Sequence, residues 1–221
     1  MGEMVELTAD DGHTLSAYVA GKPDAASSVV IIQEIFGVNS HIRSIVDLYA
    51  DLGFRAIAPA MFDRAERDVS LDYTEEGMAE GFAIRENIDW LTTPKDIGAA
   101  IEYVRRDHPV AVIGYCWGGG ASWLAASELN IDAAVSYYGG QIKAFIDRAP
   151  KCPTLLHFGE TDHSIPPEDV VLIHETYPDI PVYVYEDAGH GFNCDIRASY
   201  NAGASAVALA RTKAFLAEHL R

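Results

Sequence analysis

Short apolar runs that alternate with helical segments are the feature that most limits what this chain can fold into. Each run has the length of a strand, and the first is apolar enough to be buried on both faces. The runs are SVVIIQE, FRAIAPA, PVAVIGY, IDAAVSYYG, PTLLHFG and PVYVYE. Helical patterns lie between them, at residues 40–53, 94–107, 119–130 and 167–178. This order predicts an α/β fold with a mostly parallel sheet and helices on both faces.

The remaining segments depart from this alternation. Residues 4–9 and 14–20 alternate in polarity around the turn DDG, which predicts a hairpin and antiparallel edge strands. The acidic segment 64–90 is expected to be a helical excursion over the end of the sheet where α/β proteins bind ligands. A final helix is expected from about Arg197 to Leu220, with a break near Gly203. No linker or repeat divides the sequence, so we predict one domain over residues 1–221.

Charge and cysteine content narrow the class of protein. Thirty-three acidic against sixteen basic residues give a net charge of -17, which disfavours nucleic acid and anionic membranes as partners. No signal peptide opens the chain, and no apolar run approaches the roughly 20 residues of a membrane span, so we expect a cytoplasmic protein. Cys116, Cys152 and Cys194 have neither disulfide nor metal-site spacing, and no metal or other cofactor is expected. The sequence leaves the oligomeric state open.

The stretch PVAVIGYCWGGGASWLAA combines a strand, a sharp turn and a helix. In G-x-S-x-G turns, glycines two residues before and after the nucleophile avoid a collision at the corner. Gly114 and Gly118 hold those places here, and Cys116 holds that of the nucleophile. The start of a helix favours a thiolate, which is the reactive form of cysteine. The alternative is a buried cysteine in an ordinary glycine-rich connection.

Two further residues complete a catalytic pattern. Asp162 follows the strand LLHFG and His190 follows VYVYE, so the chain order is nucleophile, acid, histidine. Cys116 would attack an acyl carbon, His190 would carry the proton, and Asp162 would orient the imidazole. Two backbone N–H groups would stabilise the oxyanion, and we expect them from Trp117 and Ile35.

With these residues located, the chain resembles the dienelactone hydrolase (carboxymethylenebutenolidase) family, a branch of the α/β-hydrolases without a cap domain that uses cysteine. The resemblance covers nearly the whole chain and rests on DGHTLSAYVA, IIQEIFGVN, GYCWGG, GETDHSIP and AGHGF. It implies an α/β-hydrolase fold and hydrolysis of small esters or lactones through an acyl-enzyme on Cys116. It also implies that Glu34, in QEIFG, helps to govern the ionisation of the thiol.

The resemblance leaves the substrate open. Family members bind a substrate carboxylate with two arginines, and the matching positions here are Met78 and Cys194. A tyrosine contact of the family becomes Phe82, and two other arginines lie nearby in the sequence. The substrate contacts expected on these grounds are Phe82, Arg85 and Arg197. Tyr137, after the strand AAVSYYG, is expected to line the pocket as well, with core packing as the alternative.

Two other functions also fit a cysteine at such a turn. Amidotransferase-like and deglycase-type enzymes use the same turn but place histidine directly after the cysteine, where this chain has Trp117. A non-catalytic redox sensor would need only a low-pKa thiol, and it would show fast oxidation by peroxide without ester turnover.

Overall fold

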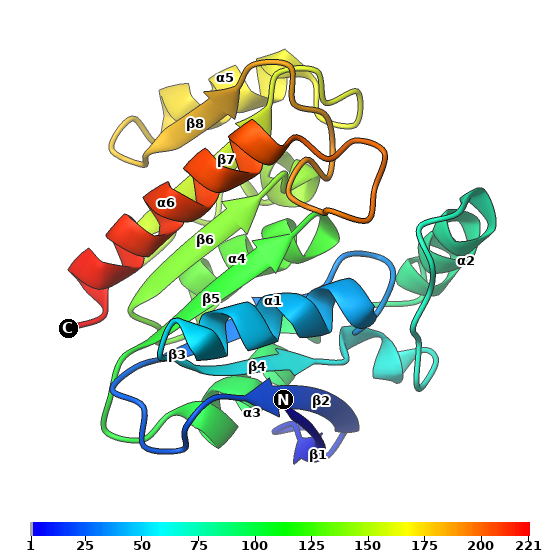
Figure 1. The fold of residues 1–221 in the computed structure, drawn as a ribbon, viewed down its shortest axis with the longest axis vertical. Coiled ribbons are helices and arrows are strands. Elements are labelled where there is room, and N and C mark those ends of the chain that lie inside the picture. The colour runs from blue at the N-terminus through cyan, green and yellow to red at the C-terminus, as the bar shows by residue number, and fades with distance from the viewer. Residues whose placement is uncertain (1) are drawn as a thin grey trace. The chain divides into compact units, whose positions relative to one another are not determined.

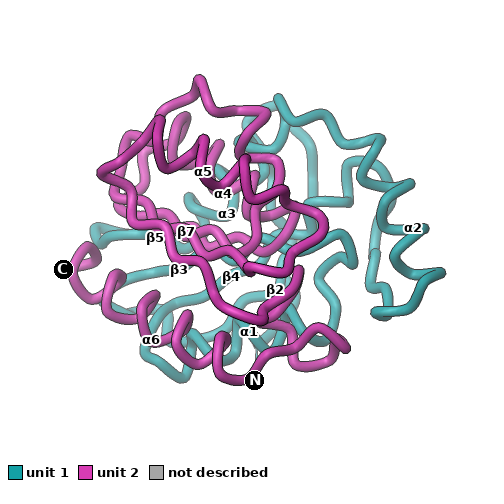
Figure 2. Tube along the Cα trace, turned by 90° about the horizontal axis from the view of Figure 1, so that it is seen from above, with its two compact units in different colours: residues 1–110 teal, residues 111–221 magenta. Residues whose placement is uncertain are grey.

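The computed structural model describes residues 2–221, and the chain divides into two compact units. The first unit ends at Val110 and the second runs from Ala111 to Arg221 (Figure 2). Each unit combines sheet strands with helices in the order that the apolar runs predict. Since the two units are compact each by itself, the single domain over residues 1–221 stays a prediction.

In the first unit, four strands follow the order β1-β2-β4-β3. Strands β1 (Glu3–Thr8) and β2 (Thr14–Ala20) form the predicted antiparallel hairpin, and β2 also pairs antiparallel with β4 (Arg55–Pro59). Strand β3 (Ser28–Ile32) pairs parallel with β4 and is buried along its whole length. The hairpin therefore supplies the antiparallel edge, and the continuous apolar run supplies the buried strand.

Helices α1 (Ser40–Asp51) and α3 (Thr93–Val104) lie on opposite faces of these strands (Figure 1). The side chain of Asn39 caps α1 by accepting a hydrogen bond from the Ile42 N–H at 3.2 Å. The predicted apolar face of α1 is buried, and the helix ends before Gly53, whose φ of +99° suits the left-handed stop expected there. Pro94 lies in the first turn of α3, also as expected.

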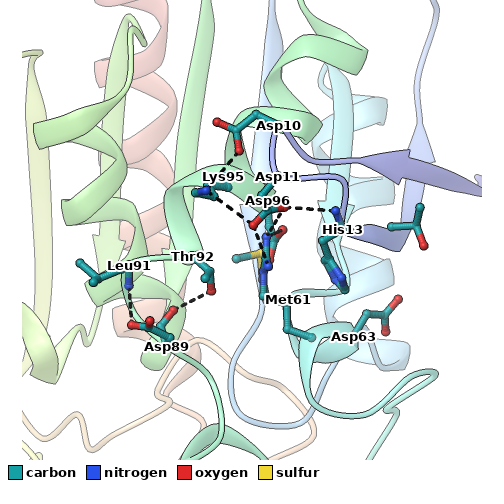
Figure 3. Close-up of polar contacts among 12 residues, drawn as sticks. Asp10, Asp11, His13, Met61, Asp63, Asp89, Leu91, Thr92, Lys95 and Asp96 are labelled. Carbon is teal, nitrogen blue, oxygen red and sulfur yellow. Dashed lines mark hydrogen bonds and ion pairs between the residues drawn. The ribbon is translucent and has the colours of Figure 1, made fainter.

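The acidic excursion contains the short 3₁₀ helix η1 (Met61–Arg64) and helix α2 (Glu75–Arg85), which lies apart from α1 and α3 (Figures 1 and 2). Arg64 anchors its start, because Nε and Nη2 each donate to the carboxylate of Asp96 at 2.7 Å. Asp11 and Lys95 extend this cluster (Figure 3). Arg64 Nη1 lies 3.0 Å from Asp11 Oδ2. The β1–β2 turn, η1 and the start of α3 are thereby tied together.

In the second unit, β5 (Val110–Tyr115), β6 (Ala133–Tyr137), β7 (Thr154–Gly159) and β8 (Val182–Tyr185) pair in chain order, all parallel. Their registers bring Tyr115 opposite Tyr137 and Gly159 opposite Tyr185, so the carboxyl ends of all four strands share one edge. The other elements are α4 (Trp117–Glu128), η2 (Gly140–Phe145), α5 (Pro167–Thr176) and α6 (Ala202–His219). Figure 1 shows α6 on the opposite face of these strands from α4 and α5.

The prediction for the last helix was wrong at its start and in its break. Helix α6 begins at Ala202, where the Asn201 side chain accepts a hydrogen bond from the Ala204 N–H at 3.0 Å. Gly203 lies in the first turn, and the helix runs through it without interruption. A glycine costs little stability in the first turn of a capped helix, because the cap already holds the chain there. Since the helix begins at Ala202, Arg197 lies in the loop before it.

A buried polar network joins α6 to strands β6, β7 and β8 inside the second unit. His157 Nδ1 lies 2.8 Å from the hydroxyl of Tyr185, and Nε2 lies 3.0 Å from that of Thr212. The hydroxyl of Tyr137 bonds to the same Thr212 oxygen at 2.7 Å. Burial, helped by the charge of Arg211, lowers the pKa of His157 to about 3, so the imidazole is neutral in the folded protein at neutral pH.

The architecture agrees with the predicted fold class, a mostly parallel α/β arrangement with antiparallel N-terminal strands. Between residues 2 and 221 there is no separate cap domain, and the longest departure from the strand and helix order is the segment that holds η1 and α2. No helix in the described part of the chain has the length and apolarity needed to cross a membrane.

Candidate active site

The turn between β5 and α4 places Cys116 at the carboxyl edge of the strands. Its backbone has φ 55° and ψ -116°, a conformation that non-glycine residues seldom adopt. A Cβ on Gly114 would overlap the carbonyl group of Gly118, and one on Gly119 would lie 2.7 Å from the Cα of Gly139. The glycines are therefore required by the close approach of helix, strand and loop at this corner.

The imidazole of His190 is in contact with the two other residues of the predicted triad. His190 Nε2 lies 3.0 Å from Cys116 Sγ, and His190 Nδ1 lies 2.8 Å from Asp162 Oδ2. Asp162 comes from the loop after β7 and His190 from the loop after β8. The parallel registers explain the meeting, because each of the three residues follows a strand that ends at the same edge.

Hydrogen bonds hold the acid and the histidine in place. The N–H of Ser164 donates to Asp162 Oδ1 at 2.8 Å, which leaves Oδ2 for the imidazole. The hydroxyl of Ser199 donates to the His190 carbonyl at 2.7 Å and secures the loop on which the ring is carried. Asp162 and His190 are thus each held in place by a contact outside the triad.

The electrostatics of the site favour a charged histidine. Burial alone would lower the pKa of His190, but the negative charge of Cys116 and the hydrogen bonds to Asp162 and Cys116 outweigh it and raise the pKa to about 10. A protonated imidazole donates from both ring nitrogens, to the carboxylate on one side and to the sulfur on the other. Cys116 also occupies the N-cap of α4, whose dipole favours negative charge at that end.

A cluster of aromatic side chains packs next to the His190 ring. Tyr138, buried and with φ 42°, lies edge-on to the His190 ring with centroids 5.1 Å apart. Phe192 packs against Tyr138 at 5.4 Å, and the rings of Tyr115 and Tyr137 stack at 4.8 Å below. The imidazole therefore has an aromatic ring against it, and the Asp162 side chain that it contacts is fully buried, which strengthens their interaction.

The structure also places the other expected residues of the second unit. Trp117 is the buried first residue of α4, so its backbone lies at the positive end of that helix. Tyr137 is buried and its hydroxyl bonds to Thr212. Arg197 lies over the histidine loop, with Nη1 placed 2.5 Å from where a Cβ on Gly191 would be. Binding of substrate by Tyr137 and Arg197 stays a prediction.

In the first unit, Glu34 and Ile35 are buried in the loop that follows β3. The Tyr73 hydroxyl donates to Glu34 Oε2 at 2.7 Å, and the Tyr73 ring lies 4.3 Å from that of Phe36. Helix α2 carries Phe82, which is 48% exposed, and the half-buried Arg85. The roles expected for Glu34, Ile35, Phe82 and Arg85 stay predictions.

Sequence reasoning missed several residues that support the site. Ser164 had a detectable signal, because an aspartate two residues before a serine commonly accepts its N–H in a turn. Tyr73 had none, since it lies 39 residues from Glu34 in a segment without a regular pattern. The other cysteines have different surroundings: burial raises the pKa of the Cys152 thiol to about 11, and Cys194 is fully buried.

Comparisons with a family model, with curated proteins and with solved structures all point to one family. The model of the dienelactone hydrolase family matches residues 15–220. The chain is 34% identical to the carboxymethylenebutenolidase of Pseudomonas putida over 97% of this chain and 96% of that protein. It is 31% identical to carboxymethylenebutenolidase 1 of Cupriavidus pinatubonensis, over 98% and 97% of the two chains. A crystal structure of a Klebsiella pneumoniae protein assigned as a dienelactone hydrolase superposes with a TM-score of 0.83 at 25% identity, covering 97% of this chain and 99% of that one.

Proposed function

Because the chain belongs to the dienelactone hydrolase family and is a hydrolase of lactones or esters, we propose that Cys116, His190 and Asp162 form its catalytic triad and that the reaction passes through an acyl-enzyme. One observation carries this proposal, the continuous contact from Cys116 Sγ through the imidazole to Asp162 Oδ2, at 3.0 and 2.8 Å. These separations are those at which a base can exchange a proton with a nucleophile while an acid orients it.

The mechanism follows from these contacts. The Cys116 sulfur adds to the carbonyl carbon of the ester or lactone, and the carbonyl oxygen takes up the negative charge. The N–H groups of Trp117 and Ile35 stabilise that oxygen. When the C–O bond to the alcohol breaks, His190 gives its proton to the leaving oxygen, and a thioester remains on Cys116.

Water then completes the cycle. His190, now neutral, takes a proton from a water molecule, whose oxygen adds to the thioester carbonyl. Collapse of that adduct releases the carboxylic acid and returns the sulfur as a thiolate beside a protonated imidazole. Asp162 keeps the Nδ1–H of His190 directed at itself in both half-reactions, so that Nε2 always faces the reacting atoms.

The test is pre-steady-state hydrolysis of p-nitrophenyl acetate by the wild type, Cys116→Ala, Asp162→Asn and, as a matched control, Cys152→Ala. We expect a burst of p-nitrophenol in the wild type and in Cys152→Ala, and none in Cys116→Ala. Asp162→Asn should lower the acylation rate by roughly 10³- to 10⁴-fold, because the imidazole loses its orienting acceptor. Full activity in folded Cys116→Ala would refute the proposal.

Turnover of a set of lactones by the same variants defines the class of substrate. A panel of lactones with and without a carboxylate is required, because Met78 and Cys194 stand where family members have carboxylate-binding arginines. Loss of preference for a carboxylate on substitution of Arg85 or Arg197 would assign those residues to substrate binding.

A further inference from the structure

The segment that leads into α2 holds the loop after β3, residues 34–39, through its main chain. The N–H of Leu71 donates to the carbonyl of Phe36 at 2.9 Å, and the side-chain amide of Asn39 donates to the carbonyl of Leu71 at 3.1 Å. Ser70 forms an antiparallel bridge with Gly37. The loop 34–39 is thus paired with the acidic excursion almost as one strand is paired with another.

Helix α2 reaches the same loop through glycines. Its buried residues are Gly77, Gly81 and Ile84, whereas Met78 and Phe82 are 38% and 48% exposed. A Cβ on Gly81 would overlap the carbonyl oxygen of Ile35, and it would lie 3.1 Å from the carbonyl carbon and 3.4 Å from the Cβ of that residue. The backbone of α2 therefore lies directly on the backbone of Ile35, with no side chain between them.

We propose that Gly81 is a positioning residue for the oxyanion donor: because the backbone of α2 lies against the carbonyl group of Ile35 at this point, it limits where the main chain of Ile35, and with it the Ile35 N–H, is held. This inference rests on the proposed function, in which that N–H stabilises the charged oxygen. The contacts of residues 70–73 with the same loop hold it on one side, and α2 at Gly81 limits its movement on another.

The size of the effect follows from the overlap. To accommodate a Cβ at position 81, helix and loop must separate by on the order of 1 Å before the new contact reaches the ordinary C···O spacing of about 3.3 Å. Ile35 cannot move its side chain away from the contact, because the overlapping atom belongs to the main chain. A displacement of about 1 Å in a catalytic group can reduce a rate by roughly 100-fold.

The experiment compares two reactions of Cys116 in Gly81→Ala. Acylation by p-nitrophenyl acetate develops an oxyanion, whereas alkylation by iodoacetamide displaces iodide at a saturated carbon and develops none. We expect the acylation rate constant at saturating ester to fall by roughly 10- to 100-fold, with KM within about twofold of the wild type. The alkylation rate constant should stay within about twofold of the wild type, because it depends on the thiolate alone.

One glycine variant serves as a matched control. Gly98→Ala, in α3, makes the same substitution but adds a Cβ where no atom lies within 4 Å. It should acylate at close to the wild-type rate. Circular dichroism verifies that each variant is folded.

A gentler variant covers the case in which Gly81→Ala does not fold. Ile84→Val trims the apolar anchor of α2 one turn from Gly81 by a single methyl group. It should lower acylation by about two- to fivefold without changing alkylation.

The outcomes separate two kinds of failure. The inference is overturned if folded Gly81→Ala acylates at the wild-type rate, if Gly98→Ala loses as much activity, or if alkylation falls in parallel. It is also overturned if Ile84→Val leaves acylation unchanged while Gly81→Ala is unfolded. Absence of a burst in the wild type would instead refute the proposed function.

Discussion

The neutral, buried His157 makes a prediction about stability and pH that can be tested independently of activity. In the unfolded chain a histidine titrates near pH 6.5, whereas in the folded protein the pKa of His157 is lowered to about 3. As the pH falls from 7 to 5, the unfolded state therefore binds a proton that the folded state excludes. The stability contributed by this group is present above about pH 6.5 and is lost progressively toward pH 3.

The magnitude can be worked from that shift. For a group that is neutral in the folded state throughout, the difference in proton binding between pH 7 and pH 5 amounts to about 2 kcal/mol of unfolding free energy. In His157→Gln this contribution disappears, while a polar group remains near the Thr212 hydroxyl. The variant should start less stable at pH 7, by about 1–3 kcal/mol for the altered hydrogen bonds. Between pH 7 and pH 5, the free energy of unfolding of the variant should then fall by about 2 kcal/mol less than that of the wild type.

The assay is urea unfolding of both proteins at pH 7 and pH 5, followed by circular dichroism and tryptophan fluorescence. Two of the three tryptophans, Trp117 and Trp123, are buried in the unit that contains His157, so fluorescence reports on that unit. Carboxylates titrate in both proteins and cancel in the comparison. Equal losses of stability in wild type and variant would show that His157 is protonated in the folded state and would refute the reasoning.

Two further predictions concern the ion pairs and the cysteines. Asp96→Asn should lower the free energy of unfolding by about 3 kcal/mol, because the largely buried Arg64 guanidinium loses its main partner. Lys95→Ala, at the exposed edge of the cluster, should lower it by less than about 1 kcal/mol. Thermal unfolding of both variants tests this difference, and equal losses of stability would contradict it. Iodoacetamide at pH 7.5 should label Cys116 before the other cysteines, since burial raises the pKa of Cys152 to about 11 and encloses Cys194. Mass spectrometry identifies the labelled residue, and modification of Cys152 or Cys194 first would contradict this prediction.

Patterns that repeat along the chain were the ones that could be predicted. The apolar face of α1 follows from the spacing of Ile42, Ile45, Val46 and Tyr49, because helix periodicity and burial coincide there. The meeting of Cys116, Asp162 and His190 follows from the position of each residue after a parallel strand. In both cases regular secondary structure converts sequence order into spatial position.

Contacts that depend on loop conformation could not be predicted. The bond between Tyr73 and Glu34 joins two irregular segments, and no periodicity relates their side chains. The positive φ of Tyr138, 42°, is a conformation that a tyrosine does not itself favour, so no residue preference indicates it. The start of α6 was misplaced because the cap at Asn201 depends on a chain direction that the loop after β8 determines.

The corner at Cys116 has a consequence for how such enzymes can diversify. Its unusual backbone angles are maintained by glycine contacts and by the helix that begins there, and none of these involves the sulfur. The location of the reacting atom and its chemical identity are therefore specified by different residues. A mutation that replaces the sulfur can change reactivity while the scaffold persists, whereas a mutation of Gly114 removes the corner itself. The reacting atom at position 116 is thus the part that the fold leaves exchangeable, and Gly114 is the part that it constrains.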